Sequence, residues 1–98
     1  MDISYQTYDQ GSDVLLAACD EDILGRTLEN EEVQLKVKES FYGGKKISTE
    51  RLKRKLETCT IANLVGKNTV EAAIEKGFGD ENDVMDIEGV PHLQVVRL

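Results

Sequence analysis

The longest uninterrupted apolar run of this chain covers only residues 14–19, and the residues before it indicate how it folds. Residues 3–8 alternate between apolar and polar side chains and are rich in Tyr and Thr, a pattern typical of a β-strand. Between the two segments lies Gln-Gly-Ser-Asp, a sequence of turn formers. Together they predict a β-hairpin. A run this short is far below the ~18 residues of a membrane-spanning helix, so we expect no membrane partner.

Three further segments have strand character. In residues 33–38 apolar and polar side chains alternate strictly, which predicts a central strand. Residues 84–87 and 92–96 predict a second hairpin around Glu88 and Gly89. Residues 60–65 are apolar and short, so the pattern leaves both strand and helix open there.

Helix signals occur at three places. Asp20 precedes two acidic residues and predicts a short capped helix that ends at Gly25. Asn68 predicts the cap of another helix, with Glu71 at the capping-box position and Gly77 at its end.

The remaining helix begins at Ser48, and its apolar residues share one face. Leu52, Leu56 and Cys59 recur at helical spacing, while basic residues occupy the rest of the surface. We therefore expect Cys59 to be a core residue and not a reactive thiol.

These elements predict one α+β domain over residues 1–98. We expect about five mostly antiparallel strands, in two hairpins plus a central strand, with two or three short helices on one face. A chain of 98 residues that is 40% hydrophobic can bury one modest core. Two widely separated cysteines are no disulfide framework, and the first residues lack a secretory signal pattern. We accordingly expect a cytoplasmic protein.

Charge is distributed unevenly along the chain. The net charge of -7 divides into -8 over residues 1–35, +6 over residues 36–55 and -5 over residues 56–98. An acidic protein is usually a poor candidate for nucleic-acid binding. The central basic block would nevertheless attract anions if the fold keeps it on one side. The alternative is an ordinary solvated face.

The basic block contains a candidate anion-binding site. Two glycines let backbone N–H groups approach an anion, cations surround them, and a helix N-terminus follows. A neighbouring tyrosine adds a ring that can stack on a base. The alternative is a tight strand-to-helix turn with lysines in solvent. The candidate anion- or RNA-binding residues are Tyr42, Gly43, Gly44, Lys45, Lys46, Arg51, Arg54 and Lys55.

Four phrases of the chain carry a family resemblance. They are LLAACDEDILGRT (15–27), FYGGKKIS (41–48), TIANLVGKNTVEAAIEKG (60–77) and GVPHLQVV (89–96). In this order they resemble an archaeal family of small uncharacterised proteins, catalogued as domain of unknown function 424. The resemblance implies a cytoplasmic archaeal protein with one compact α+β domain, and it suggests a ribonucleoprotein or translation-associated role. It supplies no activity, substrate or catalytic residue.

Within these phrases, the glycines fit backbone roles and the apolar residues fit core packing. A short set of polar residues has no such explanation. Asn63 within an apolar run and His92 after Pro91 need hydrogen-bond partners if they are buried. Such residues form a site if the fold brings them together, and are local hydrogen-bonding devices if it does not. The candidate polar cluster comprises Cys19, Asp20, Asn63, Lys67, His92 and Gln94.

Three functions follow from these observations. The first is a non-catalytic interaction module that binds a protein partner or a second copy of the chain through an edge strand of the terminal hairpin. The second is binding of RNA or a ribonucleoprotein through the basic block. The third is a small-ligand protein or enzyme around His92. No catalytic residue is assigned. Two cysteines and one histidine lack ligand spacing, so we expect no metal and no cofactor.

Overall fold

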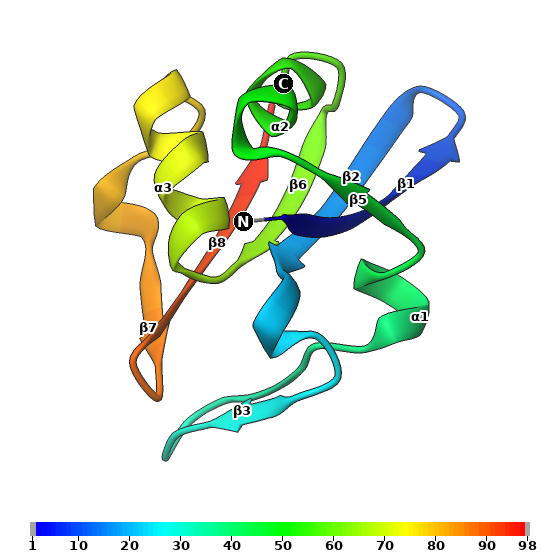
Figure 1. The fold of residues 1–98 in the computed structure, drawn as a ribbon. Helices are drawn as coiled ribbons and strands as arrows, with labels where there is room; N and C mark the ends of the chain where they lie inside the picture. The colour runs from blue at the N-terminus through cyan, green and yellow to red at the C-terminus, as the bar shows by residue number, and fades with distance from the viewer. Residues whose placement is uncertain (1, 98) are drawn as a thin grey trace.

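The computed structural model describes residues 2–97 and confirms the α+β class. Its main sheet has six strands in the order β5-β1-β2-β6-β8-β7 (Figure 1). Neighbouring strands are antiparallel except β2 and β6, which pair in parallel. The strands are β1 (Ile3–Gln10), β2 (Asp13–Asp20), β5 (Lys45–Ile47), β6 (Ile61–Val65), β7 (Met85–Ile87) and β8 (Val90–Val96).

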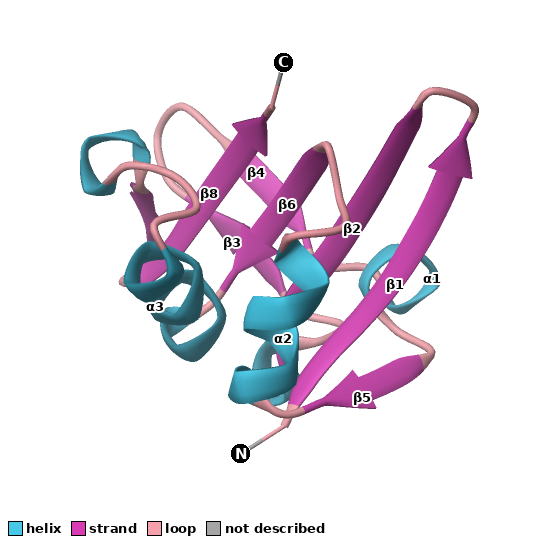
Figure 2. Ribbon diagram, turned by 90° about the horizontal axis from the view of Figure 1, so that it is seen from above, coloured by secondary structure: helices cyan, strands magenta, loops and turns pink. Residues whose placement is uncertain are grey.

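The two faces of the main sheet are covered differently (Figure 2). Helices α2 (Thr49–Leu56) and α3 (Lys67–Lys76) pack on one face, which we call the helix face. Helix α1 (Glu39–Tyr42) and a separate sheet of β3 (Thr27–Glu29) and β4 (Gln34–Lys36) lie on the other, which we call the second face. Two 3-10 helices, Glu21–Ile23 and Glu81–Asp83, complete the described elements. No helix within residues 2–97 is long and apolar enough to cross a membrane.

Both predicted hairpins are confirmed. Strands β1 and β2 pair from Ile3 opposite Asp20 to Gln10 opposite Asp13, and β7 and β8 pair around residues 88–89. The ambiguous segment 60–65 contains strand β6. It lies between β2 and β8 in the interior of the sheet, where Ala62, Leu64 and Val65 are buried, so its sequence is largely apolar.

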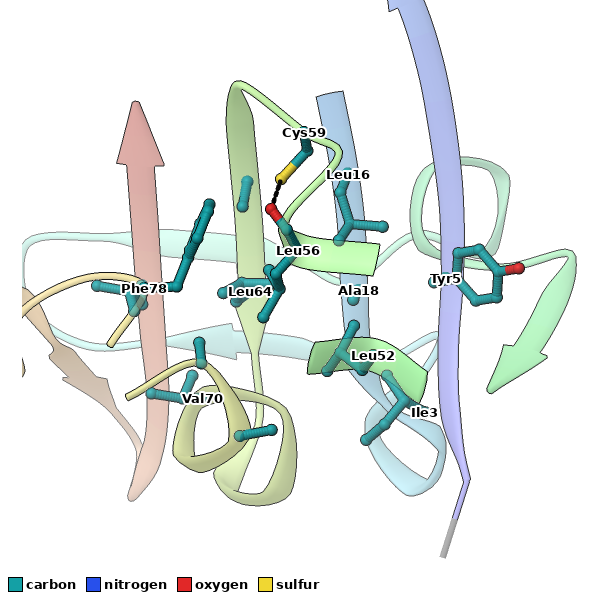
Figure 3. Packing of buried hydrophobic residues seen from close by; sticks show 14 of the residues in the cluster. Ile3, Tyr5, Leu16, Ala18, Leu52, Leu56, Cys59, Leu64, Val70 and Phe78 are labelled. Atoms are coloured by element: carbon teal, nitrogen blue, oxygen red, sulfur yellow. Dashed lines mark hydrogen bonds between the residues drawn. The ribbon is translucent and has the colours of Figure 1, made fainter. Parts of the chain in front are cut away.

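The main core lies between α2, α3 and the helix face (Figure 3). Leu52 and Leu56 are fully buried there, and Cys59 is 3% exposed and donates to the Leu56 carbonyl at 3.2 Å. The Ser48 hydroxyl accepts from the Arg51 N–H at 3.2 Å and so caps α2, the helix that the sequence predicted to begin at Ser48.

One detail of the predicted architecture is wrong. Residues 33–38 do not form a central strand, because β4 pairs only with β3 at the periphery. Their alternation has another origin: Val37 is 1% exposed and packs in the core of the second face. The prediction of two or three short helices on one face is confirmed by α2 and α3, which share the helix face. Phe41 and Tyr42 hold α1 against the second face, opposite α2 and α3.

Candidate functional site

A groove of about 520 Å³ lies on the second face of the main sheet, where α1 and β4 leave part of the sheet uncovered. This volume is within the range of small-molecule sites. We call it the sheet groove. Four of its lining residues come from the main sheet and six from the β4–α1 segment: Tyr8, Asn63, His92 and Gln94, and Leu35, Lys36, Lys38, Ser40, Phe41 and Tyr42.

Strand alternation turns the sheet residues toward the groove. On β8, His92 and Gln94 line the groove, whereas Leu93 between them is fully buried in the core of the helix face. Asn63 on β6 also lines the groove, and the strand register places it directly opposite Gln94.

The two amides form a hydrogen-bonded pair. The Gln94 Nε2 amino group donates to Asn63 Oδ1 at 2.9 Å. Each side chain amide has one amino and one carbonyl group, so this bond leaves the Asn63 amino group and the Gln94 carbonyl available. The pair therefore offers a ligand one donor and one acceptor side by side.

His92 lies beside this pair in a half-buried position. Its Nε2 is buried and has no hydrogen-bond partner among residues 2–97. Burial lowers the pKa of the imidazole from its ordinary value of 6.5. The groove thus contains a neutral histidine at pH 7, with an unsatisfied nitrogen that costs free energy.

Aromatic contacts attach α1 to β1 and shape the wall of the groove. The Tyr8 hydroxyl donates to the Phe41 carbonyl at 2.8 Å, with the Ser40 carbonyl 3.2 Å away. The Tyr8 and Phe41 rings stack at 5.3 Å between centroids, and Phe41 contacts Tyr42 edge-on at 5.0 Å. Tyr42 is 3% exposed, and burial, with a smaller effect of Cys19, raises its pKa to about 12.

Every charged side chain that lines the groove is basic. Lys36 and Lys38 are exposed, and neither forms an ion pair with a carboxylate in the described part of the chain. The lining of the groove therefore carries positive charge, although the protein has 19 acidic residues and a net charge of -7.

The predicted polar cluster divides. Asn63, His92 and Gln94 come together in the groove, but Cys19, Asp20 and Lys67 do not line it. Cys19 is fully buried in the core of the second face. Burial, followed by the charges of Asp20 and Asp22, raises the pKa of its thiol to about 12. Lys67 is exposed at the start of α3.

Asp20 caps a different helix from the one that the sequence predicted. Its Oδ1 accepts from the Thr69 N–H at 2.8 Å and the Thr69 hydroxyl at 2.7 Å, and its Oδ2 accepts from the Asn68 N–H at 3.1 Å. Asp20 thus caps α3, and makes no side-chain cap bond to the 3-10 helix after it. The predicted cap, Asn68, lies inside α3, whose N-cap is Gly66.

The predicted anion-binding residues also divide, and four of them form one surface. Arg51, Arg54 and Lys55 of α2 line a hollow of about 250 Å³ with Ile47 and Thr58. The Lys55 Nζ lies 5.7 Å from the ring centroid of Tyr5, and Lys45 is opposite Tyr5 in the strand register. We call Lys45, Arg51, Arg54 and Lys55 the basic surface.

The other members of the predicted set have different surroundings. Lys46 forms an ion pair with Glu21 at 2.6 Å. Gly43 and Tyr42 are buried, and the Gly43 N–H donates to the Glu39 carbonyl at 2.9 Å. This N–H is therefore not available to an anion. Gly44 is exposed next to Lys45.

The sequence pattern did not assign Tyr8, Leu35, Lys36, Lys38, Ser40 or Phe41 to a site. Alternation does place Lys36 and Lys38 on the polar side of residues 33–38. The alternation does not predict which part of the main sheet these two lysines lie against. Within residues 2–97, no three side chains of His, Cys, Asp and Glu are arranged to hold a metal ion.

The fold and these surfaces define a small α+β protein with a six-stranded main sheet, two helices packed on one face and a groove lined by basic residues on the other. A family model described as Protein of unknown function (DUF424) matches residues 7–98, so the chain belongs to this family.

A solved structure supports the same fold. The crystal structure of an uncharacterized conserved protein from Methanopyrus kandleri is similar to this chain with a TM-score of 0.82 and 27% sequence identity. The similarity covers 100% of this chain and 95% of that one. This neighbour agrees with the archaeal family that the sequence phrases indicated. No curated protein sequence matches the chain.

Proposed function

We propose that this protein is a non-catalytic RNA-binding module that contacts phosphates through the basic surface. The observation that carries the proposal is the state of its four cations. None of Lys45, Arg51, Arg54 and Lys55 lies within 4.0 Å of a carboxylate in the described chain. Three of them surround one hollow.

Two neighbouring lysines of the basic block do form ion pairs with carboxylates. Lys53, on the same helix, contacts Glu75 at 3.0 Å and Glu50 at 3.7 Å, and Lys46 contacts Glu21. Acidic residues thus neutralise the cations beside the basic surface and leave its own four free. A polyanion gains most from such a cluster, because each phosphate contact releases a counterion.

The experiment is a titration of labelled single-stranded RNA, followed by anisotropy at several salt concentrations. Binding by the wild type should weaken with salt, with a log–log slope of about -0.7 per phosphate contact. The test variant is Arg51→Glu with Arg54→Glu, because both side chains are exposed. It should bind at least about tenfold more weakly and with a shallower slope.

The matched control is Arg26→Glu with Lys67→Glu, which changes the net charge equally at two exposed positions outside the basic surface. It should retain most of the affinity. Equal losses in both variants would show that only net charge matters, and absence of RNA binding by the wild type at low salt would reject the proposal.

A second candidate is binding of a protein partner or a second copy of the chain at the β7 edge. Two large apolar side chains are exposed there, Met85 on β7 (46%) and Val96 on β8 (64%). Strand β7 covers only three residues, so β8 extends beyond it. Light scattering over a range of concentrations tests self-association, and Val96→Lys should abolish any dimer that uses this edge.

A further inference from the structure

We infer that the sheet groove is a nucleotide-binding site, which takes a planar base on its amide pair and a phosphate on its lysines. The site is separate from the basic surface, since the groove lies on the second face and α2 packs on the helix face. The inference stands on three independent properties of the groove.

The first property is charge selection. The chain has 19 acidic residues, yet none of them lines the groove, whereas Lys36 and Lys38 do. Both ammonium groups are free of ion pairs in the part of the chain that the structure describes. The ligand is therefore anionic, and two adjacent lysines suit the charge of a phosphate.

The second property is the pattern of hydrogen-bonding groups on the sheet. The bond between Gln94 and Asn63 leaves one amino group and one carbonyl group side by side. Reversal of both amides would leave the same two kinds of group, so the pattern does not depend on the amide orientation. Each nucleobase has an edge with an adjacent donor and acceptor, which this pair complements.

The third property is a wall suited to a flat ring. Tyr8 and Phe41 stack on each other at an interplanar angle of 16°, and both are half-buried in the wall. Bases stack on such side chains with little dependence on sequence. His92 adds a half-buried imidazole to the lining of the groove.

A nucleotide unites these three requirements in one molecule, with an anionic group, a polar edge and a flat ring. A volume of about 520 Å³ accommodates one such unit. The unit is either a free mononucleotide or one residue of an RNA strand, and the chemistry of recognition is the same for both.

The test is calorimetric titration of the wild-type protein with AMP, GMP, CMP and UMP, with the matching nucleosides, and with inorganic phosphate. At least one monophosphate should bind at least about tenfold more tightly than its nucleoside and than phosphate alone. The inference is overturned if no monophosphate binds at concentrations up to about 5 mM. It is also overturned if phosphate alone binds as tightly, because the base would then contribute nothing.

Variants locate the site. Lys36→Gln with Lys38→Gln should weaken monophosphate binding at least about tenfold. The control, Arg26→Gln with Lys67→Gln, removes the same charge at two exposed positions outside the groove and the basic surface, and should leave this binding unchanged. Gln94→Met should weaken the monophosphate and its nucleoside alike, whereas Gln34→Met, at an exposed position outside the groove, should weaken neither. Binding that is insensitive to both groove variants would overturn the assignment.

A short RNA oligonucleotide, titrated in parallel, separates the two sources of the nucleotide. Tighter binding of the oligonucleotide, lost in the groove variants, assigns the groove to RNA. Tighter binding of the mononucleotide assigns it to a free nucleotide. The RNA proposal for the basic surface fails separately, since it depends on Arg51 and Arg54 and not on Lys36 and Lys38.

Discussion

Asp20, at the end of β2, holds the first turn of α3 through Thr69, which lies 49 residues further along the chain. One carboxylate oxygen accepts from both the backbone N–H and the hydroxyl of Thr69, and the other accepts from the Asn68 N–H. A negative charge at a helix N-terminus is also favoured by the helix dipole. This contact links β2 of the main sheet to α3, and Asp20 is only 5% exposed.

Removal of this carboxylate should destabilise the protein. Asp20→Ala leaves the N–H groups of Asn68 and Thr69 without their acceptor, and we expect a loss of about 2–3 kcal/mol in the free energy of unfolding. Urea denaturation measures it. Asp22→Ala is the control, because Asp22 is exposed, and should change stability by less than about 0.5 kcal/mol. Similar losses in both variants would contradict the cap.

The residue before α3 should not tolerate a side chain. Gly66 has φ +109°, and a Cβ there would lie 2.5 Å from the Asp20 carboxyl carbon. Gly66→Ala must therefore displace the cap as well as strain the backbone. Gly11→Ala is a suitable comparison, since Gly11 has φ +78° but open space around it. We expect Gly66→Ala to cost at least about 2 kcal/mol more in urea denaturation. Equal costs would exclude the clash.

Both thiols should be unreactive in the folded protein. Burial raises the pKa of Cys59 and raises that of Cys19 to about 12, so thiolate is scarce at neutral pH. Reaction with Ellman's reagent should be at least about a hundredfold slower than in urea, where both cysteines react. A single thiol that reacts at the rate of a free cysteine would identify a site that opens in the native state.

His92 should make stability depend on pH in a defined direction. Burial lowers the pKa of its imidazole below 6.5, so the unfolded chain binds a proton more readily than the folded one. At pH values well above 6.5 the imidazole is neutral in both states and has no effect on the pH dependence of stability. Stability is lost as the pH falls through 6.5 toward the lower folded pKa. Melting temperatures from about pH 7.5 to pH 5.5 should fall more for the wild type than for His92→Gln. Parallel curves would contradict this assignment.

The Tyr8 hydroxyl should be needed to hold α1 against the sheet. Tyr8→Phe keeps the stacked ring but removes the bond to the Phe41 carbonyl, and we expect a loss of about 1 kcal/mol. Hydrogen exchange should accelerate at the α1 amides of Phe41 and Tyr42. Tyr5→Phe is the matched control, since the Tyr5 hydroxyl has no hydrogen-bond partner in residues 2–97. Unchanged exchange in Tyr8→Phe would show that packing alone holds α1.

Local patterns predicted the parts of the fold that depend on neighbouring residues. The turn at residues 10–13, the Ser48 cap and the apolar face of α2 each act within a few positions, and each is present in the structure. The charge division also follows from the sequence alone, including the basic block that supplies the basic surface.

Contacts between distant residues were decided only by the tertiary structure. Alternation in residues 33–38 identified one buried and one polar side, but a small sheet against the second face satisfies it as well as a central strand does. Asp20 and Asn68 are both good cap residues by type, and their placement made Asp20 the acceptor for an N–H of Asn68. The sheet groove joins three strands of the main sheet with the β4–α1 segment, and its amide pair spans 31 residues. Side-chain type sets which groups need partners, whereas packing of the sheet faces decides which partners they meet.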